Sequence, residues 1–326
     1  MKTTSRITLA LVILTGVGVG LAVLMDTGSP ALGSRIRWQT SKQCLQCHEA
    51  IGSEWHGSHH QISFLNPEVK KLSDDFKNTE CQACHLPRPV FEIGIGKRTL
   101  PRMTRPDEGV DCLTCHLGAE GEILARHDVP GAPCKPRANA TFTSVDLCAS
   151  CHNQHGTTDQ FRASSHAKQG GHCNDCHMEP VPRNGVPGQG RSHVFIGAHD
   201  KAMLTKAATF EVGKESGEIV ATVTNVGAGH NFPTEERHRA VDVLVRFVAS
   251  DGTAGEWQRL WRFRQPYRDE PGENTQLPAG ESKTVRIAIQ AGAKRAEARL
   301  WYRLNPFAVD GDAASTLLFE RVVALP

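Results

Sequence analysis

The chain has 326 residues, of which 39% are hydrophobic and only 6% aromatic, and its 37 basic and 35 acidic side chains give a formal net charge of +2. This near balance offers neither a basic surface for nucleic acid nor a polybasic patch for a membrane. The length is sufficient for two domains.

Residues 1–33 predict an export segment. Lys2 and Arg6 precede an uncharged run from residue 7 to residue 25. A run of about 19 residues is long for a signal core and just long enough to span a bilayer. Ala31 and Gly33 are small residues at the offsets that fit cleavage before Ser34, so a signal peptide and a retained N-terminal membrane anchor both stay open. Either outcome predicts a periplasmic or extracellular location for the rest of the chain, with or without an anchor to the cytoplasmic membrane.

Residues 34–203 contain the pentapeptide C-x-x-C-H five times. In this motif two thiols add to the vinyl groups of a haem, and the adjacent imidazole becomes an axial iron ligand. Zinc ribbons and disulfide frameworks also use paired cysteines, but neither requires a histidine after every second cysteine. The sequence therefore predicts five haem c groups, attached through Cys44, Cys47, Cys81, Cys84, Cys112, Cys115, Cys148, Cys151, Cys173 and Cys176, with proximal ligands His48, His85, His116, His152 and His177.

The same region is poor in long apolar runs and rich in glycine, proline and polar residues. We expect short helices around the haem sites, proline- and glycine-containing loops between them, and haems in place of an apolar core. The spacing of the sites follows no strict period, but a looser duplication is present. Trp55-x-x-Ser58-x-His60 precedes the second site and Phe161-x-x-Ser164-x-His166 precedes the fifth, both with helical spacing.

Eleven histidines remain for the five distal positions, and methionine is scarce, so two histidines per iron is the expected ligation. The duplication singles out His60 and His166. His230 lies in a glycine-rich turn that could approach the haem region closely. His193 follows the fifth site and His127 lies between the third and fourth, and either could be replaced by one of two other histidines, His155 or His199.

Residues 204–326 contain no cysteine and show alternating hydrophobicity. The best examples are 219–224, 241–247, 285–289 and 298–302, separated by turn signals at 213–217, 250–252, 271–272 and 278–281. About seven short strands separated by such turns predict an immunoglobulin-like β-sandwich. The expected fold class is α+β, with a helical and loop-rich multihaem domain followed by this sandwich.

The haem region resembles the multihaem c-type cytochromes grouped with the tetrahaem nitrification cytochromes and the hydroxylamine oxidoreductase-like enzymes. The matching segments are Trp55 to His60, Glu108 to Cys112, Leu147 to Asn153, and Cys176-His177-Met178 with a following proline. The segment Gly229 to Thr234 resembles a turn of extracytoplasmic multihaem cytochromes that carry a β-sandwich, where its histidine is a haem ligand. The resemblance implies closely stacked haem pairs that pass electrons along the protein.

The chain departs from these relatives in two respects. It lacks the C-x-x-C-Lys of pentahaem nitrite reductases, and its two tyrosines, Tyr267 and Tyr302, lie outside the haem region. Because histidines are in surplus, an electron conduit is favoured, with redox proteins or a quinol-oxidising membrane complex as partners. Two alternatives stay open: a reductase or oxidase of a small nitrogen or sulfur species at one five-coordinate haem, and a subunit that self-associates into a haem filament or membrane complex.

Overall fold

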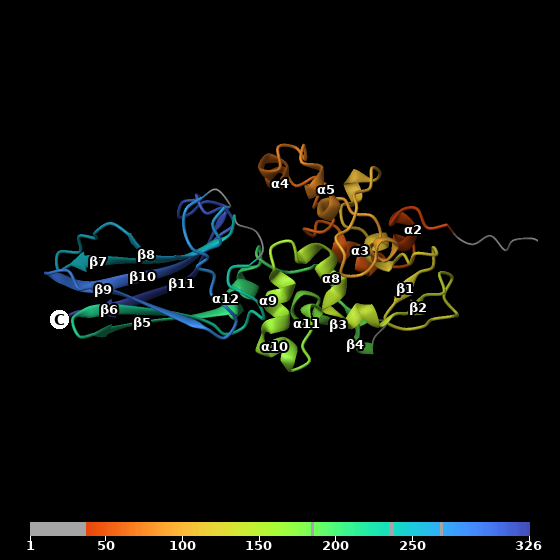
Figure 1. The fold of residues 1–326 in the computed structure, drawn as a ribbon. Coiled ribbons are helices and arrows are strands. Elements are labelled where there is room, and N and C mark those ends of the chain that lie inside the picture. The colour runs from red at the N-terminus through yellow and green to blue at the C-terminus, as the bar shows by residue number, and fades with distance from the viewer. Residues whose placement is uncertain (1–36, 184–185, 235–237, 268–269) are drawn as a thin grey trace, which may run out of the picture. The chain divides into compact units, whose positions relative to one another are not determined.

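The computed structural model describes residues 37–183, 186–234, 238–267 and 270–326 (Figure 1). The predicted export segment, residues 1–33, lies outside these ranges. The chain divides into two compact units, Met1–Trp38 and Gln39–Pro326, and the features below belong to the second. Among the described residues, no helix combines the length and the hydropathy needed to cross a membrane.

Each C-x-x-C-H begins on a short helix, as predicted. These helices are α2 (Lys42–Leu45), α5 (Thr79–His85), α7 (Cys112–His116), α8 (Val145–His152) and α11 (Cys173–His177). Polar side chains start several of them: Asn78 accepts a hydrogen bond from the Glu80 N–H, and Ser144 accepts one from the Asp146 N–H. Asp111 and Thr114 form a capping box at the start of α7.

Other short elements fill the spaces between these helices. They are α3 (Glu49–Trp55), α4 (Pro67–Leu72), α6 (Val90–Ile93), η1 (Pro106–Glu108), η2 (Ala140–Thr143), α9 (Thr157–Ala163), α10 (Ser165–Lys168) and α12 (Lys201–Ala207), with the strand pairs β1 (Leu124–Ala125) and β2 (Arg137–Ala138), and β3 (Pro180–Arg183) and β4 (Val186–Arg191).

The duplicated segments are not continuous helices, although their spacing is helical. In the first copy α3 ends at Trp55, and Gly57 follows with a φ of +79° that a helix does not allow. In the second copy α9 ends before Ser164 and α10 begins after it. The Ser164 side chain accepts a hydrogen bond from the Ala167 N–H. Ser164 is therefore the N-cap of α10. In both copies the histidine follows the point at which the first helix ends.

The part of the chain after α12 that the structure describes forms seven strands in two antiparallel sheets, in agreement with the strand pattern of the sequence. The strands are β5 (Ala208–Glu215), β6 (Glu218–Asn225), β7 (Ala240–Ala249), β8 (Gln258–Phe263), β9 (Ser282–Ala288), β10 (Ala293–Arg303) and β11 (Ser315–Ala324). One sheet has the order β11-β10-β7-β8 and the other β5-β6-β9.

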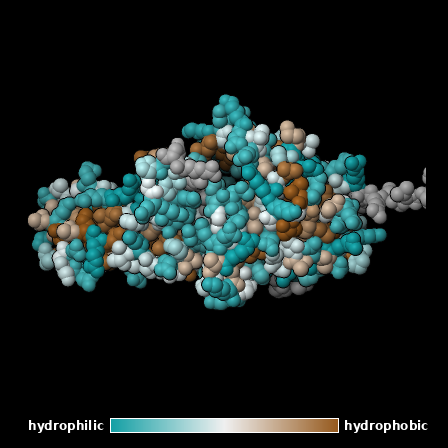
Figure 2. Space-filling view, viewed as in Figure 1, coloured by the Kyte–Doolittle hydropathy of each residue, from teal (hydrophilic) through white to brown (hydrophobic). Residues whose placement is uncertain are grey.

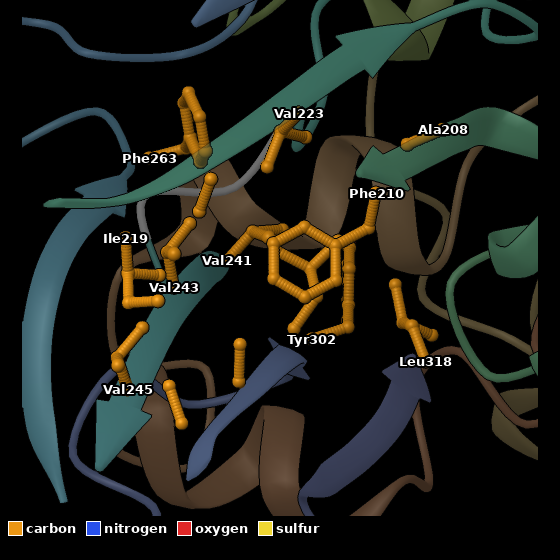
Figure 3. Close-up of a cluster of buried hydrophobic side chains, with 14 of the residues drawn as sticks. Ala208, Phe210, Ile219, Val223, Val241, Val243, Val245, Phe263, Tyr302 and Leu318 are labelled. Atoms are coloured by element: carbon orange, nitrogen blue, oxygen red, sulfur yellow. The ribbon is translucent and has the colours of Figure 1, made fainter. Parts of the chain in front are cut away.

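Both sheets contribute to one hydrophobic core (Figure 3). Alternate residues of β6 are buried, which leaves Ile219, Ala221 and Val223 facing inward. Phe210 of β5 and Tyr302 of β10 lie in the same core. Burial of each such large side chain contributes about 1.5–3 kcal/mol. The residues of this core cluster all come from Leu204 onward.

The surface in Figure 2 is mainly hydrophilic, with hydrophobic side chains gathered over the C-terminal strands and among the N-terminal helices. In the region of the C-x-x-C-H helices several large apolar side chains remain exposed: Leu65, Leu72, Leu100, Met103, Val129 and Val194. Side chains alone therefore leave apolar surface uncovered there.

Candidate haem sites

Three of the five C-x-x-C-H histidines face a second histidine from a distant part of the chain. The ring centres are 6.0 Å apart for His152 and His60, 6.5 Å for His116 and His193, and 6.2 Å for His177 and His230. A ring nitrogen binds a metal at about 2.0–2.1 Å and lies about 1 Å from the ring centre, so two rings on opposite sides of one ion have centres about 6 Å apart. Each of the three distances therefore agrees with the separation expected for two imidazoles bound to one iron.

Backbone carbonyls orient several of these rings. Nδ1 of His116 donates to the Leu124 oxygen (2.8 Å), and Nδ1 of His177 donates to the Ile196 oxygen (2.7 Å). The same atom of His85, at the second site, donates to the Ser63 oxygen (3.0 Å). A ring that donates through Nδ1 keeps Nε2 as its lone-pair nitrogen, and this is the usual way in which a histidine ligand is oriented.

The pair of His116 and His193, at the third C-x-x-C-H, also has the protonation state that a ligand needs. Burial lowers the pKa of His116 to about 4, and burial likewise lowers the pKa of His193 below its usual value. Both imidazoles are therefore neutral at pH 7, with a lone pair available for a metal.

Glu54 of α3 holds the segment that carries His193. Its Oε2 accepts hydrogen bonds from the His193 N–H (2.9 Å) and from Nη2 of Arg183 (2.6 Å). Burial alone would raise the pKa of Glu54, but these two hydrogen bonds and the charge of Arg183 bring it below the usual range. The carboxylate is therefore charged at neutral pH and ties α3 to this segment.

The turn that carries His230 is fixed from both sides. Asn225, fully buried, donates from Nδ2 to the His230 oxygen (2.8 Å). Oε1 of Gln160, on α9, accepts from the Asn231 N–H (3.2 Å) and from the Thr234 hydroxyl (2.6 Å). Position 229 must be glycine, because a Cβ there would lie 2.9 Å from the Phe161 ring.

Contacts between thiols show which sites are neighbours. The side chains of Cys44 and Cys112 interact, as do those of Cys84 and Cys151, and those of Cys148 and Cys173. The first site therefore lies against the third, the second against the fourth, and the fourth against the fifth. These contacts raise the pKa of Cys44, Cys148 and Cys151, and burial raises the pKa of Cys115 to about 12. Most of these thiols are half-buried, whereas Cys47 and Cys176 are exposed.

The two other predicted distal ligands lie elsewhere. His127 is exposed on the loop between β1 and β2, and His166 is exposed on α10. Neither belongs to a ring pair among the described residues. His59 and His199 are stacked with ring centres only 3.8 Å apart, which leaves no space for an iron between them.

Several residues that shape these sites could not be predicted from the sequence. Phe195 contacts the rings of both His60 (4.1 Å) and His193 (5.6 Å), and its φ of +54° is unusual for a bulky residue. Glu54 and Gln160 each accept two hydrogen bonds from residues more than 70 positions away in the sequence. A φ above zero outside glycine and hydrogen bonds between remote residues are visible only in three dimensions.

Comparisons with known proteins found one family match and one structural match. Residues 43–117 match the sequence model of the family described as cytochrome c554 and c-prime. The chain resembles the crystal structure of a penta-heme cytochrome c552 from Thermochromatium tepidum, with a TM-score of 0.66 and 20% identity over 88% of this chain and 98% of that one. No curated protein matches. Together the two matches support a multihaem c-type cytochrome, and the structural likeness shows a shared fold that includes both helices and sheets.

Proposed function

We propose that this chain is an exported electron-transfer protein with five covalently bound haem c groups in residues 34–203 and an immunoglobulin-like β-sandwich in residues 204–326. The observation that carries the proposal is the set of three histidine pairs, each separated by the space that one iron needs. A bound haem iron would supply reversible one-electron oxidation and reduction.

The residues of the chain support this use in three ways. Two imidazoles on each of three irons would fill the axial positions, which suits electron transfer and excludes small ligands. The thiol contacts would keep neighbouring sites close enough for electrons to move between them. The uncovered apolar side chains of the helical region, among them Leu65, Leu100 and Val129, would be covered by the macrocycles.

The second domain supplies one of the ligands, His230. Three- and four-stranded antiparallel sheets around a common core support an immunoglobulin-like arrangement. His127 and His166 complete the proposed ligand set. A soluble redox protein or a quinol-oxidising membrane complex would exchange electrons with the chain, and self-association into a longer haem chain is part of the same proposal.

The test is the mass of the denatured protein combined with low-temperature EPR of the native protein. Five haem additions and low-spin signals at the sites of His116, His152 and His177 are expected. Fewer than five additions would remove the haem assignment, and high-spin iron at any of these three sites would contradict the ligand pairs. A high-spin iron that binds nitrite or hydroxylamine would instead indicate a catalytic site. Fractionation of expressing cells tests export.

A further inference from the structure

Four charged side chains, three of them buried, form a network just before the third C-x-x-C-H. Arg102, Glu108 and Asp111 are only 7%, 4% and 3% exposed. Arg105 lies 3.0 Å from Asp111 and 3.3 Å from Glu108, and Arg102 lies 3.6 Å from Asp111. We call these four residues the Glu108 network. Its two guanidinium groups and two carboxylates balance, so the network as a whole is neutral.

Glu108 connects this network to the first haem site. Oε1 accepts a hydrogen bond from the Thr40 hydroxyl, and Oε2 accepts one from the Ser41 N–H (2.9 Å). Ser41 is the N-cap of α2, the helix that carries Cys44. Burial works against the charge of Glu108, but these hydrogen bonds and Arg105 bring its pKa below the usual range, so the carboxylate is ionised at neutral pH.

The same network belongs to the third site. Oδ1 of Asp111 accepts from the Thr114 N–H (2.7 Å) and caps α7. The Cys112 N–H donates to the Ser41 hydroxyl (3.1 Å), so residues of the first and third sites are bonded directly as well as through Glu108. The Cys44 and Cys112 thiols meet at the same place.

The backbone around Glu108 has little freedom. Arg105 has a φ of +54° and Gly109 a φ of +46°. A Cβ at position 109 would lie 2.5 Å from the His60 oxygen and 2.2 Å from the Gln61 oxygen. The Val110 N–H donates to the same His60 oxygen (2.8 Å), and Nη1 of Arg102 donates to the Pro87 oxygen (2.7 Å) beyond the second site. Glu108 is thus held between segments of several sites at once.

We propose that Glu108 is a positioning residue that fixes the first haem site against the third and keeps the reduction potentials of both irons low. The inference rests on the proposed function. A buried charge acts strongly because the surrounding dielectric constant is low. Without the Glu108 carboxylate the network has one positive charge in excess, and a nearby positive charge destabilises ferric iron more than ferrous iron. The potentials of the two adjacent sites should then rise.

The test compares Glu108→Gln, Thr40→Val and Glu92→Gln in the full-length protein. Glu108→Gln keeps the shape and removes the charge, whereas Thr40→Val keeps the charge and removes one hydrogen bond. Glu92 is the matched control, because it forms an ion pair with Arg88 in which both side chains are about two-fifths exposed. Each variant is titrated by spectroelectrochemistry, and EPR reports the magnetic interaction between neighbouring irons.

In Glu108→Gln we expect a positive shift for two of the five haems and no shift for the other three, whereas Glu92→Gln should leave all five unchanged. In Thr40→Val we expect weaker magnetic interaction between one pair of haems. Unshifted potentials in Glu108→Gln, or an equal shift of all five, would overturn the inference. If Glu108→Gln does not retain five haems, the Thr40→Val variant provides the test. An EPR spectrum of Thr40→Val identical to that of the parent protein would then overturn the inference. The parent protein, measured first, tests the proposed function separately, through its haem number and spin states.

Discussion

A facing pair of histidines has a simple physical requirement: each ring must present a lone pair along the line between them. At His116 and His177 a backbone carbonyl meets this requirement by binding Nδ1. At His193 the neighbouring Arg191 oxygen accepts from Nδ1 (2.9 Å), and Glu54 fixes the backbone. Ligand orientation here depends on groups that are not themselves ligands.

Replacement of a distal histidine should therefore affect one iron at a time. In His60→Ala, His193→Ala and His230→Ala we expect one low-spin haem in each variant to become high spin, with all five haems still covalently attached. EPR and the denatured mass measure the two properties. The same experiment on His127→Ala and His166→Ala determines whether those exposed histidines are ligands. A variant of His193 with an unchanged spectrum would show that its position opposite His116 is only packing.

The charge of Glu54 should make the third site sensitive to acid. Because its pKa is lowered in the folded protein, the stability that it contributes is present above the unfolded value of about 4.3 and is lost as the pH falls through the folded value. We expect the low-spin signal of one haem to decline in that range. Glu54→Gln should lack this step and should be less stable at pH 7 by about 1 kcal/mol. A pH titration by EPR that is identical in the two proteins would contradict the role of Glu54.

At the scale of elements, the turn between β6 and β7 shows how a loop of the second domain is fixed to α9. Gln160 accepts hydrogen bonds from two residues of the turn, Asn231 and Thr234, and Asn225 donates one to the His230 oxygen. The strands and their hairpins could be predicted from alternation and turn residues, because those signals are local. The contact of Gly229 with Phe161 joins positions 68 residues apart and has no local signal.

A matched pair of glycine substitutions tests this contact. Gly229→Ala places a Cβ against the Phe161 ring and should cost about 1–3 kcal/mol, with partial conversion of one haem to high spin because His230 moves. In Gly213→Ala, on β5, the added Cβ has no atom within 4 Å, so this substitution should leave both stability and spin state nearly unchanged. Thermal unfolding and EPR give the two readings. Equal behaviour of the two variants would mean that the turn adapts freely.

At the scale of the whole molecule, the sequence predicted the two kinds of structure and the helices at the haem sites. It did not predict which histidine faces which. His60 faces His152 across 91 intervening residues, although its position in the duplication suggested only that it is a ligand. The covalent motif is read from five adjacent residues, whereas a distal ligand is set by the packing of remote segments. The equivalence of His60 and His166 was inferred from a repeat, and in the structure the first lies opposite another histidine and the second is exposed.

Removal of residues 208–326 should separate attachment from ligation. All C-x-x-C-H motifs lie upstream, so five haem additions should remain in the truncated protein. The loss of His230 should leave one iron high spin, with new affinity for carbon monoxide after reduction. His230→Ala in the full-length chain is the control and should reproduce the spectral change. Five low-spin haems in the truncated protein would show that the second domain supplies no ligand.

If His230 binds a haem iron, its position in a turn of the strand domain would couple folding to oxidation state. Imidazole ligation favours ferric over ferrous iron, in contrast to methionine, which raises the potential. If the bond from His230 forms only when the strand domain is folded, a thermodynamic cycle requires that domain to be more stable in the oxidised protein. A tenfold difference in ligand affinity between the two states corresponds to about 1.4 kcal/mol. The strand domain would then melt at a lower temperature after reduction. Its unfolding temperature would thus report the oxidation state of one iron, although its strands carry no haem attachment site.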